Sequence, residues 1–214
     1  MLCRYFLIAA LSVSALGVAA AAEADTGTKA RFFAKETVSL AGVVALPALS
    51  DGSFEELDGT TTLTRTKTGV GFTFNTRDLA AQAPYTVWWV TFNRPRRCLE
   101  PYRCGADDLG NPAVEPGVFF ATGRLSDAYG QAEFSGQVDY GELPQGEDQV
   151  PLPGLDRPIR PGAEIHLVIR AHGPALDDPE ALEAQLTQFD GGCPPNDCVD
   201  VQASVHPSPK LRLW

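Results

Sequence analysis

The strongest constraint on the fold of this chain is the spacing of its apolar residues, which alternate with polar residues along several short segments. A period of two is that of a β-strand with one buried face. The segment Thr60–Arg77 shows this alternation on both sides of a turn near Thr68 and Gly69, so it predicts a hairpin. The pattern indicates an all-β fold.

Three further segments predict strands. Both faces of the segment Tyr85–Phe92 are apolar, with Trp88 on one side and Trp89 on the other, so we expect a central strand that is covered on each face. Residues 117–141 predict a second hairpin around an Asp-Ala-Tyr-Gly turn. Residues 164–171 predict a strand with Ile165, Leu167 and Ile169 on its apolar face.

The last strand and a helix complete the prediction. Residues 198–206 alternate, and the pattern predicts inward apolar residues and outward polar ones. The inward set is Val199, Val201, Ala203 and Val205, and the outward set is Asp200, Gln202, Ser204 and His206. The spacing predicts one short helix near 178–188, with Asp178 as its cap and Pro179 in its first turn. Roughly seven to nine strands and one helix predict an antiparallel Greek-key β-sandwich.

The amino-terminus has the pattern of a secretory signal. Arg4 precedes an apolar stretch that ends near Ala19, and an alanine run up to Ala22 supplies small residues for cleavage. We therefore expect a signal peptide over residues 1–22, a flexible amino-terminus over 23–36, one sandwich domain over 37–207 and a carboxy-terminal tail over 208–214. The expected location is secreted or periplasmic.

The net charge of the chain limits the kinds of partner that it can bind. It has 17 basic and 27 acidic residues, so its formal net charge is −10 at pH 7. Such a surface repels phosphate backbones, and we expect no binding to nucleic acid. No later segment is long and apolar enough to predict a membrane span in the mature chain.

Four cysteines remain once Cys3 leaves with the signal, and they form two close pairs. Export would bring these cysteines into an oxidising compartment, where disulfides form. Prolines within each interval favour the local pairings Cys98–Cys104 and Cys193–Cys198. Cross-pairing would close a longer loop and stabilise the fold more. A zinc site made of all four thiolates is a further alternative, although the intervals are loose for zinc.

Five polar residues form a possible ligand face on the predicted sheet: Glu164, His166, Arg170, His172 and His206. His166 and His172 lie up to about 20 Å apart on an extended strand, so they do not share an ion unless the chain bends or His206 approaches. A solvated sheet face is the plainer interpretation. The alternative interpretation is a metal-assisted enzyme that uses these histidines.

Two other groups offer weaker candidates. Trp88 or Trp89 would provide a platform for carbohydrate if one of them were exposed, although core packing explains both. Acidic and amide oxygens between the first cysteine pair and residue 115 could bind calcium, but their order is not that of an EF-hand. These residues are Asp107, Asp108, Asn111 and Glu115.

Several phrases resemble those of exported bacterial proteins of unknown function: YTVWWVTFN, EIHLVIRAHGPA and GGCPPNDC followed by VQASVH. The resemblance covers roughly residues 60–206 and implies a location and a fold. A weaker likeness is to CHRD domains and Cu/Zn superoxide dismutase, which are β-sandwiches. Arg170 stands where the HxHGPA phrase of CHRD domains has its first histidine, and the copper-binding His-x-His is absent at residues 87–90. Dismutase activity is therefore not implied.

No complete catalytic motif is present, so we expect a binding or structural module rather than an enzyme. Its partner would be an extracytoplasmic ligand or protein that the sequence does not identify. We expect no cofactor.

Overall fold

The computed structural model describes residues 36–47, 53–144, 149–193 and 198–209. The predicted signal peptide, its predicted cleavage site and most of both predicted terminal segments lie outside these ranges. The described residues form eight strands and one α-helix. The strands are β1 (Thr37–Ala45), β2 (Glu56–Arg65), β3 (Gly69–Thr76), β4 (Pro84–Phe92), β5 (Pro116–Leu125), β6 (Ala132–Asp139), β7 (Glu164–Ala171) and β8 (Val199–His206), and the helix is α1 (Pro179–Thr187).

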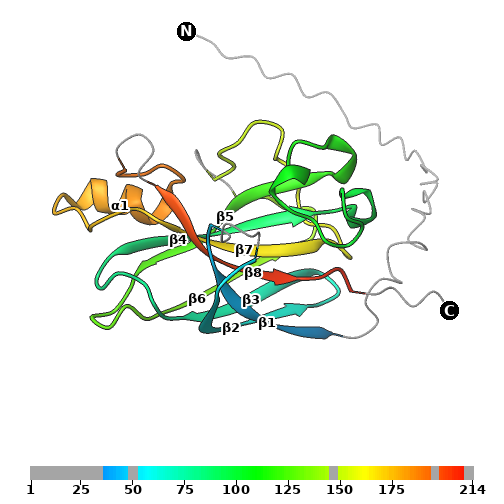
Figure 1. The fold of residues 1–214 in the computed structure, drawn as a ribbon. Helices are drawn as coiled ribbons and strands as arrows, with labels where there is room; N and C mark the ends of the chain where they lie inside the picture. The colour runs from blue at the N-terminus through cyan, green and yellow to red at the C-terminus, as the bar shows by residue number, and fades with distance from the viewer. Residues whose placement is uncertain (1–35, 48–52, 145–148, 194–197, 210–214) are drawn as a thin grey trace, which may run out of the picture.

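The strands form an antiparallel, nearly closed sheet in the order β5-β4-β7-β8-β1-β2-β3-β6. Figure 1 shows it as two layers, with β4, β5 and β7 above β2, β3 and β6. The layers are hydrogen-bonded to each other through β1 and β8, which pair at only two positions, Val44 with Ala203 and Ala45 with Gln202. This arrangement confirms the predicted all-β antiparallel fold.

Three local predictions are confirmed. β2 and β3 form the first hairpin, whose turn is closed by bonds from the Thr66 amide to the Gly69 carbonyl and from the Gly69 amide to the Thr66 hydroxyl. β4 pairs with β5 and β7, and eight of its nine residues are buried, as expected of a central strand. The Asp178 side chain caps α1 by accepting a hydrogen bond from the Ala181 amide.

The second predicted hairpin is wrong in its pairing. β5 pairs with β4 and β6 pairs with β3, and these two described strands form no ladder with each other. Their connection instead crosses from one layer to the other. It is held by Asp127, whose carboxylate accepts hydrogen bonds from the amides of Tyr129 and Gln131. These hydrogen bonds from a side chain within the turn stabilise the turn by themselves, so the turn does not require the strands on either side of it to pair.

The predicted orientation of β8 is also wrong from Gln202 onward, although Asp200 is exposed and Val201 packs against the core, as expected. Gln202 lies opposite Ile169, Ser204 opposite Leu167 and His206 opposite Ile165, so these polar residues share the inner face with the core of β7. Val205 and Val199 are instead exposed. The reversal is stable because neighbouring strands supply hydrogen-bond partners inside the sandwich. Thr76 donates to the Gln202 amide oxygen, for example.

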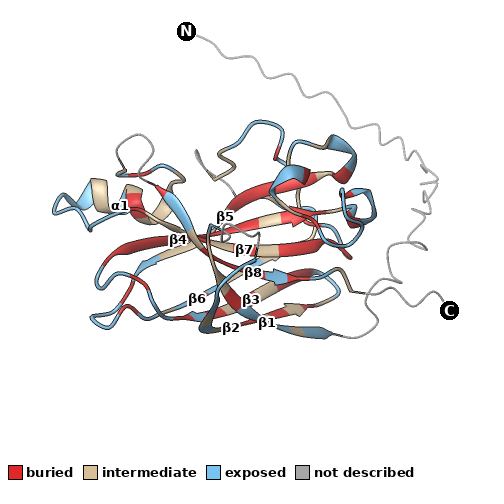
Figure 2. Ribbon diagram, viewed as in Figure 1, coloured by how far each residue is buried: buried red, intermediate tan, exposed pale blue. Residues whose placement is uncertain are grey.

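The two outer faces of the sandwich differ in their cover. At one end of β4 and β7, the segment 93–115 packs over Phe92, and at the other end Phe189 packs edge-on against Trp88. Figure 2 shows the resulting buried stretches along β4 and β5. The outer face of β2, β3 and β6 has no such cover among the described residues, and most of its side chains are partly or fully exposed. None of the helices described has the length and apolar character needed to cross a membrane.

Candidate functional site

The five residues predicted to form one polar face occupy three different surroundings. Glu164 and His166 lie at the start of β7, beneath the first disulfide loop. Arg170 and His172 lie at the other end of that strand, near the second disulfide. His206 points into the sandwich. The three histidines therefore do not form a shared site.

Glu164 and His166 attach the first disulfide loop to β7. The Glu164 Oε1 accepts a hydrogen bond of 2.8 Å from the Cys104 amide and lies 3.1 Å from the His166 Nε2. The His166 ring also packs at 5.1 Å from the Phe92 ring. Because the Glu164 side chain is almost fully buried, these contacts serve to dock the loop.

Arg170 links β7 to the segment that follows α1. Its Nη1 and Nη2 pair with Asp200 and Asp190, each at 2.9 Å, and its Nε donates to the Phe189 carbonyl. The guanidinium also stacks 3.9 Å above the centroid of the Phe189 ring. With these four contacts, Arg170 is a structural clamp.

His172 lies at the centre of a buried hydrogen-bond chain. Its Nδ1 is 3.0 Å from the Gly191 carbonyl, so that nitrogen carries the proton and donates. Its Nε2 is then an acceptor, and the Thr86 hydroxyl donates a hydrogen bond of 2.8 Å to it. The Thr86 oxygen in turn accepts from the Trp88 Nε1 at 2.7 Å. Burial lowers the pKa of His172, which keeps this imidazole neutral.

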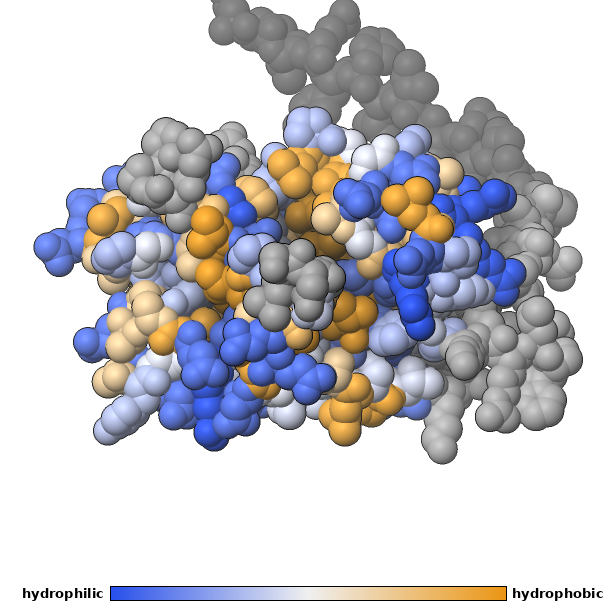
Figure 3. Space-filling model, viewed as in Figure 1, coloured by the Kyte–Doolittle hydropathy of each residue, from blue (hydrophilic) through white to orange (hydrophobic). Residues whose placement is uncertain are grey.

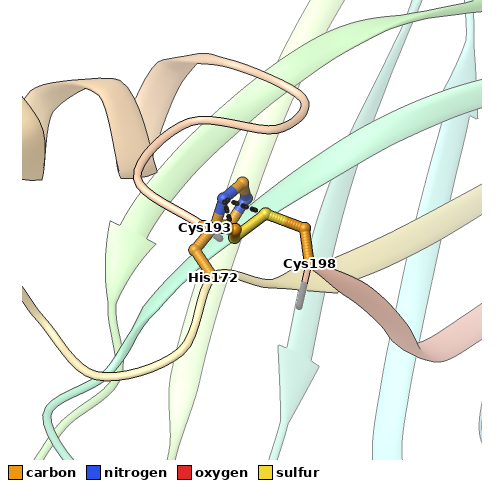
Figure 4. A group of neighbouring side chains, drawn as sticks. All are labelled: His172, Cys193 and Cys198. Atoms are coloured by element: carbon orange, nitrogen blue, oxygen red, sulfur yellow. Dashed lines mark hydrogen bonds between the residues drawn. A yellow bond between two sulfur atoms is a disulfide. The ribbon is translucent and has the colours of Figure 1, made fainter. Parts of the chain in front are cut away.

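The second disulfide lies directly against this imidazole. The structure joins Cys193 to Cys198 and Cys98 to Cys104, which are the local pairings favoured from the sequence. The His172 Nδ1 is 3.4 Å from the Cys198 Sγ and 3.7 Å from the Cys193 Sγ. Figure 4 shows the ring pointing at the disulfide. This cluster was not predictable from the sequence, because 21 residues separate His172 from Cys193.

His206 belongs to a polar network inside the sandwich. Its Nδ1 lies 3.0 Å from the Ser39 hydroxyl, and its Nε2 lies 2.8 Å from the Thr61 hydroxyl. Burial, together with the positive charge of Arg65, lowers the pKa of His206 to about 4. Arg65 is itself buried, and its side chain interacts with the Tyr140 hydroxyl. The His206 imidazole is therefore neutral at pH 7, next to the positive charge of Arg65.

The tryptophans and three of the four candidate calcium ligands are engaged within the protein. Trp88 and Trp89 are each 1 % exposed, so neither presents a face on which a sugar could stack. The Asp108 carboxylate accepts hydrogen bonds from the amides of Leu99 and Gly105. Glu115 forms ion pairs with Arg94 and Arg160, and Asn111 accepts from the Ala113 amide. Asp107 is exposed and lies next to Asp108 on the short 3-10 turn Ala106–Asp108.

One open groove lies on the uncovered outer face of β2, β3 and β6. It has a volume of about 640 Å³ and is rich in hydroxyl and amide groups. Thr62 and Thr73 are direct cross-strand neighbours at its centre, and Ser135 follows Thr73 in the next strand. Sequence reasoning did not single out this surface. Its signal was the Thr-rich arm of the first hairpin, in which alternate threonines point outward.

The same side of the molecule carries exposed apolar residues on β1. Val38 and Leu40 are 58 % and 77 % exposed, and Figure 3 shows hydrophobic atoms over this part of the surface. They lie opposite Thr64 and Thr62 in the ladder with β2. The groove is therefore bordered on its β1 side by an apolar margin.

Comparison with protein-family models gives no match, and neither does comparison with curated proteins. Among solved structures, the chain is similar to a mutant of the SOD-like protein from Bacillus subtilis, with 12 % identity and a TM-score of 0.34. The match covers 78 % of this chain and 97 % of that one. Nothing about ligands or chemistry follows for this chain from a likeness at that level.

Proposed function

We propose that the protein is an exported binding module whose ligand occupies the groove on β2, β3 and β6. The observation that carries this proposal is the difference between the two outer faces. The face of β4 and β7 is covered by the chain itself, whereas the face of β2, β3 and β6 exposes ordered side-chain hydroxyls along three paired strands.

The chemistry of the groove favours a neutral, hydroxyl-rich ligand such as an oligosaccharide. Threonine and serine hydroxyls both donate and accept hydrogen bonds, as sugar hydroxyls do. Asp139 is the acidic residue that lines the groove, and no basic residue lines it among those described. Together with the negative charge of the chain, this disfavours an anionic ligand.

A double variant tests the binding surface. Thr62→Val together with Thr73→Val removes two hydroxyls while keeping side-chain shape and strand propensity. Two lost hydrogen bonds of about 1 kcal/mol each should weaken binding about tenfold to thirtyfold. The measurement is titration calorimetry against neutral oligosaccharides selected on a glycan array, and affinity should not change with added salt.

Thr60→Val is the matched control, since Thr60 lies on the outer face of the same strand but outside the groove. It should leave affinity unchanged. The proposal fails if no neutral glycan binds, or if the control and the double variant weaken binding equally.

Export is a separate part of the proposal and has its own test. Two disulfides are compatible with an oxidising compartment. Expression of the full chain, followed by fractionation and mass determination, should recover an oxidised protein outside the cytoplasm that lacks about the first 22 residues. A cytoplasmic, uncleaved and reduced protein would contradict export.

A further inference from the structure

The cluster of His172, Cys193 and Cys198 has the donor set of a metal site that is blocked by a covalent bond. Its three potential ligand atoms lie within 4.8 Å of one another. In a tetrahedral zinc site, zinc–sulfur bonds of about 2.3 Å and zinc–nitrogen bonds of about 2.0 Å put nitrogen and sulfur about 3.5 Å apart. The His172 Nδ1 already lies 3.4 and 3.7 Å from the two sulfurs.

We propose that reduction of the Cys193–Cys198 disulfide creates a zinc site whose three protein ligands are the two freed thiolates and the Nδ1 of His172. The imidazole needs little movement. On reduction the sulfurs separate from bonded contact to about 3.8 Å, the sulfur–sulfur separation of a tetrahedral zinc site. Three protein ligands leave the fourth position for water or another ligand.

The surroundings of His172 hold the ring in place without the disulfide. The ring nitrogen that faces away from the sulfurs bonds to the Thr86 hydroxyl, and the backbone carbonyl of His172 accepts from the Gln185 side chain on α1. When a metal replaces the proton on Nδ1, that proton moves to Nε2, where the Thr86 oxygen can accept it. A fixed partner on the second nitrogen is the usual support of a metal-binding histidine.

The two redox states exchange by a balanced reaction. A dithiol reductant gives two electrons and two protons to the disulfide and is itself oxidised to a disulfide. The two cysteine thiols then lose their protons to solvent as zinc binds, because the thiolate is the ligand. Cys193 is the more accessible sulfur, since it is partly exposed while Cys198 is buried. The reductant should attack there.

The test uses the whole chain in both redox states. Protein reduced by a phosphine in the absence of oxygen, then dialysed against Zn²⁺, should retain one zinc per molecule, and the oxidised protein should retain none. Co²⁺ in place of Zn²⁺ should give sulfur-to-metal charge-transfer absorption, which reports thiolate ligation directly. X-ray absorption of the zinc form should fit two sulfurs and one imidazole nitrogen.

Two variants separate this site from the other disulfide. Cys98→Ala with Cys104→Ala should leave zinc binding intact, whereas Cys193→Ala with Cys198→Ala should abolish it. His172→Gln should lower affinity at least tenfold. Zinc retained by the oxidised protein, binding that depends on Cys98 and Cys104, or a cobalt spectrum without charge transfer would each overturn the proposal. The cobalt spectrum decides the question on the unmodified protein if a variant does not fold.

This site lies beside β7 and β8, in the layer opposite the proposed ligand groove, and shares no residue with the groove. Loss of glycan binding in the groove variants would leave zinc binding unchanged, so the failure of either proposal is distinguishable from the failure of the other.

Discussion

At the scale of single residues, the interior of this sandwich is held by neutral polar groups as well as by apolar contacts. Thr86 connects Trp88 to His172, and Thr61 connects His206 to Ser204. Each threonine hydroxyl serves more than one partner in a space that water does not reach. Removing one such group leaves its partners buried and unpaired, which costs more than the bond itself contributes.

We expect Thr86→Val to be strongly destabilising for this reason. The change keeps the shape of the side chain but leaves the Trp88 Nε1 without an acceptor and the His172 Nε2 without a donor. The free energy of unfolding should fall by about 2 to 4 kcal/mol, as measured by urea denaturation. Thr86→Ser keeps the hydroxyl and should cost about 1 kcal/mol. Equal losses in the two variants would contradict the role given to the hydroxyl.

His206 should make stability depend on pH. Its pKa is about 4 in the folded protein and near 6.5 when unfolded, so the unfolded chain binds the extra proton between these values. Stability therefore falls as the pH drops from 6.5 to 4, by a total of about 3 kcal/mol from this residue. Urea denaturation across that range should show the slope, and His206→Gln should reduce it. An unchanged slope in the variant would refute the assignment.

At the scale of secondary-structure elements, the sequence predicted best where local signals decide the structure. The first hairpin, the doubly covered strand β4 and the capped helix α1 follow from alternation and from Asp178. Pairing between distant strands has no local signal, which is why β5 and β6 were expected to pair. The orientation of β8 failed because alternation shows that a strand has two faces. Alternation does not show that Gln202, Ser204 and His206 find hydrogen-bond partners inside the sandwich.

The candidate site was predicted in parts. The four cysteines and their local pairing followed from spacing and prolines, but the neighbourhood of His172 did not. That neighbourhood depends on α1 bringing Gly191 and Cys193 back to the end of β7, a tertiary contact without a sequence pattern. The separation of His166 from His172 was predictable, because an extended strand fixes the distance between its residues.

The contact between α1 and β5 depends on Gly123. A β-carbon at this position would lie 1.9 Å from the backbone carbonyl oxygen of Leu186, near the end of the helix. We expect Gly123→Ala to displace α1 and lower the free energy of unfolding by about 1 to 3 kcal/mol. Gly110→Ala is the control, since a β-carbon there meets nothing within 4 Å. Urea midpoints that shift equally would show that close packing at Gly123 is not the cause.

At the scale of the whole molecule, two short disulfide loops secure opposite ends of the covered sheet. One loop is docked by Glu164 at the start of β7, and the other lies against His172 just beyond the end of that strand. Closing a loop of this size stabilises the fold by about 2 kcal/mol on the chain-entropy model. A covalently closed loop thus packs at each end of the covered face, while the groove lies on the other layer.

Peptide mapping of unreduced protein should find Cys98 linked to Cys104 and Cys193 linked to Cys198, with no free thiol among these four cysteines. Replacing either pair by alanine should lower the free energy of unfolding by about 2 kcal/mol without abolishing the fold. A peptide that links Cys98 to Cys193 or Cys198 would contradict the structure.

The short ladder between β1 and β8 decides how the domain responds to mechanical load. The two strands run in opposite directions and pair through Val44 and Ala45, while the start of β1 meets the end of β8 through the Ser39–His206 side-chain contact. Tension applied to those two ends pulls the strands apart sideways, so the few bonds between them break one after another rather than all together. The two layers would peel open from this seam at low force.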